Sequence, residues 1–351
     1  TIKANAKHQV NARDEVWHTI ESPYLVNTVS DLASVAYYVN RGEGNYASAR
    51  YKLSTDIILT ADVDWIAIGT EANPFNGYFN GNSNTIHYQI SALSSAFGGL
   101  FGYCGTNAYI YDLYVDGANV ETSSEYAGAI AMQLKGSLSG CSSSLNITGK
   151  YVGGLVGHII SSDSDQKIAN CFATGTLSGE EVGGLVCHFE TVKNPTLGIY
   201  ESGTIFSSYF SGKITANFAG GLVARANGIL LINNIVNTKI NSLSNANACA
   251  GGLVGLLQLD NLFNGALPTG VLGYALYNKV VVSFENSTNQ DKTALLAGQI
   301  LGSAGQGYIY LSHNTLKNDS KHSIYNSTAS SAILLDEENV LSTDSVFSGD
   351  F

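Results

Sequence analysis

A five-residue phrase, Gly-Gly-Leu-Phe/Val-Gly, recurs along the chain and restricts its fold more than any other feature. Three copies match fully, at residues 98–102, 153–157 and 251–255, and four more are close or degenerate variants. The second residues of the seven copies lie at positions 99, 128, 154, 184, 221, 252 and 298. The intervals range from 26 to 46 residues around a period of about 30, which predicts a repeat architecture.

A second phrase keeps phase with the first. Cys141, Cys171 and Ser208 each precede the first glycine of the following pair by twelve residues. Cys141 and Cys171 therefore hold matching positions on neighbouring repeats. We expect a ladder of buried thiols there, because buried cysteines behave as small apolar residues, and a disulfide between them is the alternative.

The segments between the glycines indicate which type of repeat architecture the chain forms. They are short, β-branched and alternating, as in residues 145–148, and lack the 3.6-residue spacing that arrays of helical repeats require. A parallel β-solenoid fits them, with coils stacked about 4.8 Å apart. Paired glycines would turn the chain where a Cβ atom would clash with the next coil. A β-propeller is the main alternative, although its blades usually need about 40 or more residues.

The repeat also predicts a core and an order of segments. Leu155, Leu185, Leu222 and Leu253 should form one buried ladder. Residues 1–60 are expected to form a lead-in and a helical cap, with a helix over 30–40 that Ser30 caps. The β-helix should occupy 61–335, and the acidic residues 336–351 a C-terminal tail or cap. The two long intervals predict loops, and the larger one, within 256–278, should lie down on the solenoid because it is apolar.

Composition restricts the partners. The chain has 351 residues with 17 basic and 28 acidic side chains, so its net charge is −11. An acidic chain is a poor partner for nucleic acids and anionic membranes, which favours neutral ligands such as uncharged sugars. No apolar run reaches the roughly 18 residues of a membrane span, so no membrane insertion is expected. The start at Thr1, without Met or a recognisable signal peptide, suggests a processed or excised piece.

Catalytic and metal-binding patterns are weak. Five scattered cysteines without a CxxC pair argue against a zinc or redox motif, and no cofactor is expected. β-Helix hydrolases and lyases need carboxylates, or calcium and a base, on adjacent coils. Glu180 and Glu181 are interpreted as solvated residues of a bend. His158 and His188 follow successive Gly-Gly-Leu-Val units and could stack on one face, where a metal site is the weaker hypothesis. The sequence therefore predicts a protein that is not an enzyme.

One connected series of segments resembles the opening of bacterial surface proteins with GLUG-motif repeats. It comprises residues 65–69, 75–86, 98–102 and 110–115. Residues 170–175, followed by 183–186, resemble the interior repeats of that family. The resemblance covers roughly 25–302 and implies a right-handed parallel β-helix on a secreted or cell-surface protein, many of which are described as adhesins. Size and tyrosine content are also similar to the C-terminal domain of the tapirins, which are cellulose-binding proteins.

The family pattern places Ile110, Leu113 and Val115 inside the solenoid, so the tyrosines between them should face outward. Tyrosine offers a flat apolar ring to a sugar and a hydroxyl to its edge, although outward tyrosines also simply fit strand propensity. The candidate ligand contacts are Tyr109, Tyr111, Tyr114, Tyr200, Tyr209, Phe263, Tyr274, Tyr277, Tyr308 and Tyr310.

The sequence thus predicts a monomeric, non-catalytic adhesin of the bacterial surface that binds an insoluble polysaccharide, with cellulose the first candidate. An adhesin for a surface protein is one alternative, and a β-helix lyase or glycoside hydrolase is another.

Overall fold

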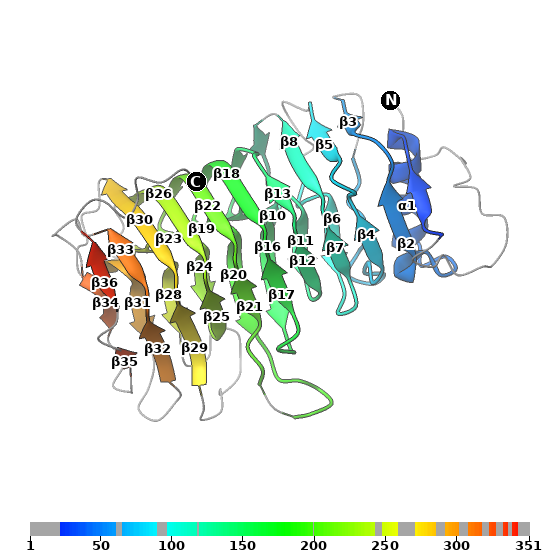
Figure 1. Ribbon diagram of the computed structural model, residues 1–351. Helices are drawn as coiled ribbons and strands as arrows, with labels where there is room; N and C mark the ends of the chain where they lie inside the picture. The colour runs from blue at the N-terminus through cyan, green and yellow to red at the C-terminus, as the bar shows by residue number, and fades with distance from the viewer. Residues whose placement is uncertain are drawn as a thin grey trace.

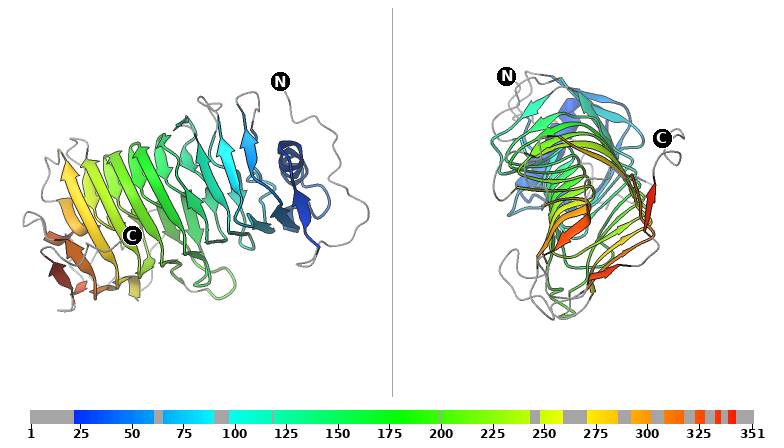
Figure 2. Two further views of the ribbon diagram at one scale, coloured as in Figure 1. Left: turned by 45° about the horizontal axis from the view of Figure 1, so that its top comes forward. Right: turned by 90° about the vertical axis from the view of Figure 1, so that its left-hand side faces the viewer.

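The chain folds into a right-handed parallel β-helix whose strands stack along one long axis (Figure 1). This computed structural model describes residues 22–60, 65–89, 97–117, 119–198, 200–242, 248–258, 271–285, 292–301, 308–317, 323–327, 333–335 and 339–342, to which the structural statements below refer. Viewed along the axis, successive coils superimpose on one another (Figure 2, right). The expected fold class is confirmed, and the propeller alternative is excluded.

Three sheets form the walls of the β-helix. Sheet 1 contains eleven strands: β1 (Tyr24–Val26), β2 (Arg50–Leu53), β4 (Tyr78–Asn80), β7 (Tyr109–Tyr111), β12 (Ser137–Ser139), β17 (Lys167–Ala169), β21 (Thr204–Phe206), β25 (Ile229–Ile232), β29 (Val271–Leu276), β32 (Tyr308–Ser312) and β35 (Ile333–Leu335). Sheet 2 contains thirteen: β6 (Phe101–Cys104), β10 (Tyr126–Gly128), β11 (Ala131–Leu134), β15 (Tyr151–Gly153), β16 (Val156–Ser161), β19 (Glu181–Gly183), β20 (Val186–Thr191), β23 (Phe218–Gly220), β24 (Val223–Ala226), β27 (Cys249–Gly251), β28 (Val254–Gln258), β31 (Thr293–Leu301) and β34 (Ser323–Ser327). Sheet 3 contains twelve: β3 (Ile57–Leu59), β5 (Thr85–Tyr88), β8 (Tyr114–Gly117), β9 (Val120–Glu121), β13 (Ser142–Ser143), β14 (Ile147–Thr148), β18 (Phe172–Ser178), β22 (Tyr209–Ala216), β26 (Ile235–Ser242), β30 (Lys279–Glu285), β33 (Thr315–Lys317) and β36 (Val340–Ser342). A coil passes through sheet 2, then sheet 1, then sheet 3.

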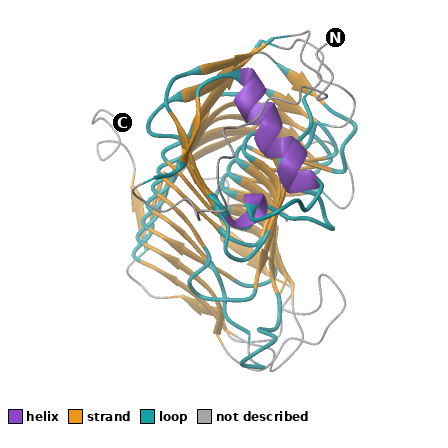
Figure 3. Cartoon of the chain, turned by 90° about the vertical axis from the view of Figure 1, so that its right-hand side faces the viewer, coloured by secondary structure: helices purple, strands orange, loops and turns teal. Residues whose placement is uncertain are grey.

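The helix α1 (Val29–Asn40) lies over the N-terminal end of the β-helix (Figure 3). It buries Leu32, Val35 and Val39 in the core, as the helical spacing predicts. Its N-cap, however, is Thr28 and not Ser30. The Thr28 hydroxyl accepts from the Asp31 N–H at 3.1 Å, and the Asp31 carboxylate accepts from the Thr28 N–H at 3.0 Å. This reciprocal capping box satisfies two backbone donors, which Ser30 could not do from inside the first turn.

The Gly-Gly-Leu units stack as predicted. Leu155, Leu185, Leu222 and Leu253 are buried. The backbone N–H of each of the first three donates to the carbonyl of the next leucine at 2.9 Å, and that of Leu253 donates to the Leu296 carbonyl at the same distance. A Cβ atom added to Gly184 would lie 2.1 Å from the carbonyl oxygen of Gly221 on the next coil. The paired glycines therefore allow the coils to approach at a bend within sheet 2, because any side chain would force the coils apart.

Sheet 1 joins sheet 3 through a turn that barely varies. In seven consecutive coils it has two residues, and the first of them has a positive φ between 46° and 63°. These first residues are Asp112, Gly140, Asn170, Ser207, Asn233, Tyr277 and His313. A single left-handed residue redirects the chain without lengthening it, so the turns stack in register.

The second residues of these turns form a buried hydrogen-bond ladder, the turn ladder. The backbone N–H of Cys171 donates to Ser208 Oγ at 3.2 Å, that of Ser208 to Asn234 Oδ1 at 2.9 Å, and that of Asn234 to Asn278 Oδ1 at 2.9 Å. The ladder begins where Cys141 N–H approaches Cys171 Sγ at 3.4 Å and continues through Asn314 to Asn339. Both cysteines are free thiols, so the core ladder is confirmed over the disulfide.

The insertions that lengthen two of the repeat intervals do not lie in these turns. They lie between the strands of sheet 2 and those of sheet 1. The segment 192–203 separates β20 from β21 and carries an antiparallel bridge between Lys193 and Tyr200, which accounts for the first long interval. In the second, Tyr274 belongs to β29 and Tyr277 to the following turn, so neither lies in a loop as expected. They are part of a coil because β29 pairs with β25 along sheet 1. The remainder of that predicted loop, residues 259–270, lies outside the described residues.

Candidate ligand-binding surface

The outer face of sheet 1 carries a tyrosine patch near its N-terminal end, formed by Tyr78, Tyr109 and Tyr111. Tyr78 and Tyr109 are in register on β4 and β7, with ring centroids 6.1 Å apart and edge-to-face. The Tyr109 and Tyr111 rings stack at 5.0 Å. The guanidinium carbon of Arg50 lies 3.7 Å from the Tyr78 ring centroid, and Asn80 adds an amide to the same face. Rings beside polar groups in this way can stack on a sugar and hydrogen-bond to its hydroxyls.

A second aromatic surface follows the turns between sheets 1 and 3. Phe172, Phe206 and Tyr277 expose 45, 41 and 54% of their surface there, on three different coils. Tyr209 is half-buried beside them, in register with Phe172. These four residues, the corner ridge, flank or occupy turns of constant length. They therefore keep their spacing along the axis at about 4.8 Å for each coil.

The structure brings together some of the predicted tyrosines and separates others. Tyr109 and Tyr111 form the patch, Tyr209 and Tyr277 the ridge, while Tyr114 begins β8 on sheet 3 and Tyr274 lies in an outward row of sheet 1. Tyr200 packs against the core instead. Tyr308 and Tyr310 lie on β32, whose side chains there are not described, and Phe263 lies outside the described residues.

Sequence reasoning overlooked Arg50, Tyr78, Phe172 and Phe206. The phase of the repeat could have found Phe172, because it follows Cys171 as Tyr209 follows Ser208. Phe206 directly precedes the equivalent turn on the next coil. Tyr78 and Arg50 precede the first clear repeat, so only their register with Tyr109 reveals them.

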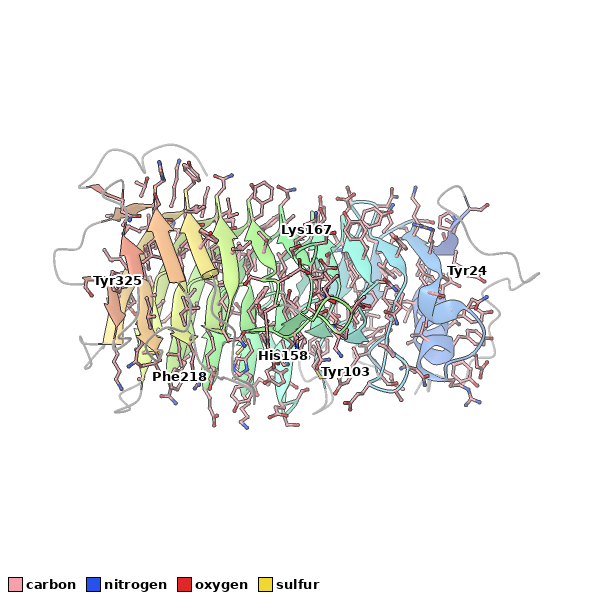
Figure 4. The ribbon with its side chains drawn as sticks, turned by 90° about the horizontal axis from the view of Figure 1, so that it is seen from below. Tyr24, Tyr103, His158, Lys167, Phe218 and Tyr325 are labelled. Atoms are coloured by element: carbon pink, nitrogen blue, oxygen red, sulfur yellow. The ribbon has the colours of Figure 1, made fainter. Side chains whose placement is uncertain are left out.

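Polar side chains gather at the bend of sheet 2, where outward residues before and after each glycine pair meet. In Figure 4, the labelled residues Tyr103, His158 and Phe218 lie along this side of the β-helix. His158 and His188 are in register on β16 and β20, which confirms that they stack on one face. We call the group of Tyr126, His158, Glu181, His188 and Arg225 the histidine network.

His188 is the centre of this network. Its Nε2 lies 2.6 Å from Glu181 Oε2, and its Nδ1 lies 3.0 Å from the Tyr126 hydroxyl. Arg225 Nε lies 2.5 Å from the same Glu181 oxygen. Burial lowers the pKa of His188, while the hydrogen bond to Glu181 opposes the shift. A neutral imidazole, donating from Nε2 and accepting at Nδ1, satisfies both contacts.

The order hydroxyl, imidazole, carboxylate is also that of nucleophilic catalysts. Two observations oppose this interpretation. Burial raises the pKa of Tyr126, which is the reverse of activation. The side chains of His188 and Glu181 are only 7 and 9% exposed, so substrate has little access. The network is better suited to joining coils. The expectation that Glu181 is solvated was wrong, because the bend turns it over His188.

Within the part of the chain that the structure describes, no group of three His, Cys, Asp or Glu side chains could hold a metal ion. The five thiols are buried, and burial raises the pKa of each one for which a shift is resolved, to about 12 for Cys249. They are poor nucleophiles and ligands in this state. Among the described residues, no helix is long and apolar enough to cross a membrane.

Known proteins share the fold and part of the sequence. No protein-family model matches the chain, so the GLUG and tapirin resemblance stays a prediction. A protein of Evansella cellulosilytica with the provisional name of Gly-rich membrane protein is 36% identical over 120 residues, 32% of this chain and 13% of that protein. Halomucin of Haloquadratum walsbyi is 31% identical over 121 residues, which is 1% of its length. Both matches span a small fraction of those proteins.

The structural comparison supports the architecture alone. A crystal structure from Bacteroides ovatus, provisionally titled an immunoglobulin A1 protease, superimposes with a TM-score of 0.60 and 16% identity. The match covers 81% of this chain and 84% of that one. At this identity the likeness extends to the fold and not to the activity.

Proposed function

We propose that this chain is a non-catalytic, surface-located adhesin that binds a polysaccharide through the tyrosine patch and the corner ridge. The observation that carries the proposal is the series of outward aromatic rings on coils of fixed spacing. The names of the two sequence relatives, a membrane protein and a mucin, support a place at the cell surface. Cellulose is the first polymer to test, because of the tapirin resemblance.

Rigid coils suit a polymer with many weak contacts. Each stacked aromatic ring contributes on the order of 1 kcal/mol. Contacts on one rigid body add without ordering new segments, and several such contacts convert weak stacking into firm adhesion. A protein-binding adhesin would use the same scaffold, with loops such as 192–203 as its contacts.

The test is adsorption to an insoluble polysaccharide panel that includes cellulose, xylan and pectin. The triple variant F172A/F206A/Y277A removes the most exposed rings of the ridge and should weaken adsorption about a hundredfold on the bound polymer, since three rings contribute about 3 kcal/mol. Soluble sugar should not appear in the supernatant.

The matched control is I58A/I66A/L197A, which truncates apolar side chains that are 46–60% exposed but lie outside both surfaces. It should adsorb like the wild type. Equal adsorption by the ridge variant, with unchanged folding, would exclude the ridge. Turnover that disappears in a single Asp or Glu variant would overturn the non-catalytic proposal.

A further inference from the structure

Charge is distributed unevenly over the three sheets. The eleven strands of sheet 1 contain Arg50, Lys52 and Lys167 but no Asp or Glu, as far as the structure describes them. Yet the chain carries 28 acidic and 17 basic residues. Salt screens exposed charges beyond about 10 Å, so a ligand on this face experiences the local charge more than the net charge of −11.

The corner ridge shows the same excess. From β17 to β33, the strands of sheets 1 and 3 and the turns between them carry five lysines and one acidic residue, Glu285. All five lysines are exposed: Lys167, Lys213, Lys239, Lys279 and Lys317. The surface that presents the exposed aromatic rings is therefore cationic.

One of these lysines, Lys279, lies close to the rings in sequence and register. Lys279 follows Tyr277 by two residues and shares an outward row with Tyr209, Ile235 lying between them in register. At about 4.8 Å for each coil, Tyr209 and Lys279 are about 10 Å apart along the axis. Ring and ammonium group thus fall within the span of a few linked sugars.

Two of the lysines stand directly opposite each other. Lys213 and Lys239 are in register on β22 and β26, an arrangement that destabilises a sheet unless an anion intervenes. One contact to an acidic residue is present, with Lys213 Nζ 3.8 Å from Glu285 Oε2, but both side chains are over 40% exposed. Such an exposed pair contributes little, so the row retains the capacity to bind an external anion.

We propose that the ligand of this surface is a carboxylated polysaccharide, a polymer of uronic acids. Its rings stack on the corner ridge and its carboxylates pair with Lys213, Lys239 and Lys279. This inference rests on the proposed function and narrows it, and it replaces the expectation of a neutral sugar that net charge alone suggested. A nucleic acid is the other polyanion that a basic face can bind, and its binding is one of the outcomes of the test.

The experiment compares binding of the whole chain to sodium polygalacturonate, to the same polymer fully methyl-esterified, and to cellulose. Esterification removes charge and keeps the rings. We expect at least tenfold tighter binding to the acid form at low salt, and loss of that preference in 0.5 M NaCl. K213Q/K239Q/K279Q should lose the preference but keep the weaker binding to the ester, whereas K135Q/K150Q/K193Q, which changes three lysines outside these strands, should behave like the wild type.

The outcomes separate the two proposals. Equal binding to acid and ester, or a preference for cellulose, overturns this inference and leaves the proposed function intact. If the chain binds neither form of polygalacturonate nor cellulose, both the proposed function and this inference are overturned for these polymers. Tighter binding to a single-stranded thymidine oligonucleotide than to polygalacturonate also overturns the inference.

Discussion

At the scale of single residues, the glycine pairs and the leucines beside them determine how closely coils approach. Leu185 is fully buried between Leu155 and Leu222. Leu185→Ala should lower the free energy of unfolding by roughly 2–5 kcal/mol, because the neighbouring coils cannot collapse into the cavity. Urea denaturation measures the loss. Leu197→Ala, at a 60% exposed position, should change it little, and equal effects of the two would contradict the ladder.

His188 should make stability depend on pH. Burial lowers its pKa in the folded state, whereas in the unfolded chain it titrates near 6.5. Below about pH 6.5 the unfolded state therefore binds more protons than the folded state. The free energy of unfolding accordingly decreases as pH falls. The thermal midpoint should decrease between pH 7.5 and 5. His188→Gln should flatten that dependence, and a slope unchanged in the variant would assign it to another group.

Single residues also show where sequence reasoning succeeds. The burial of Ile110, Leu113 and Val115 follows from alternation along strands and is confirmed. Glu181 could not be placed in this way. Its partners, His188 and Arg225, come from other strands, and only the bend at the glycine pair brings them together. A periodic pattern reports which side a residue faces, not which distant residue it meets there.

At the scale of elements, the turn ladder holds sheet 1 to sheet 3. Asn278 accepts from the backbone N–H of Asn234, and its Nδ2 donates to the Leu231 carbonyl at 3.0 Å and to Asn314 Oδ1 at 2.9 Å. Asn278→Ala would remove the hydrogen-bond partner of two buried groups, the Asn234 N–H and the Leu231 carbonyl. Because each such loss costs about 1–3 kcal/mol, the free energy of unfolding should fall by roughly 2–6 kcal/mol.

Asn237→Ala is the control, since Asn237 is exposed on β26. Urea denaturation of both variants, with hydrogen exchange at residues 233–234 and 277–278, tests the ladder. A loss no larger than that of the control would show that the ladder contributes nothing to stability.

The ladder also shows why one element was only half foreseen. The spacing of Cys141, Cys171 and Ser208 revealed the position, but its later occupants are Asn234, Asn278, Asn314 and Asn339. Cysteine, serine and asparagine look different in sequence, yet each supplies an acceptor to the preceding coil. Unequal insertions between sheets 2 and 1 then hide the common register.

At the scale of the whole molecule, the repeat and its period of about 30 residues predicted a solenoid, since that period is short for a propeller blade. The binding surface was less predictable. Net charge pointed to a neutral ligand, whereas the basic residues of sheets 1 and 3 lie beside the exposed rings. Charge segregation arises from the stacking of coils, so it becomes visible only after every strand is assigned to a sheet.

The constant two-residue turn between sheets 1 and 3 has a consequence for how such a protein changes over generations. Duplication of one coil of about 30 residues would add another rung beside the ridge and leave the existing rungs unaltered. Insertions between sheets 2 and 1 would not interrupt it. Relatives with more or fewer coils should then differ in how long they remain on a polymer, in discrete steps, while the kind of polymer they hold stays the same.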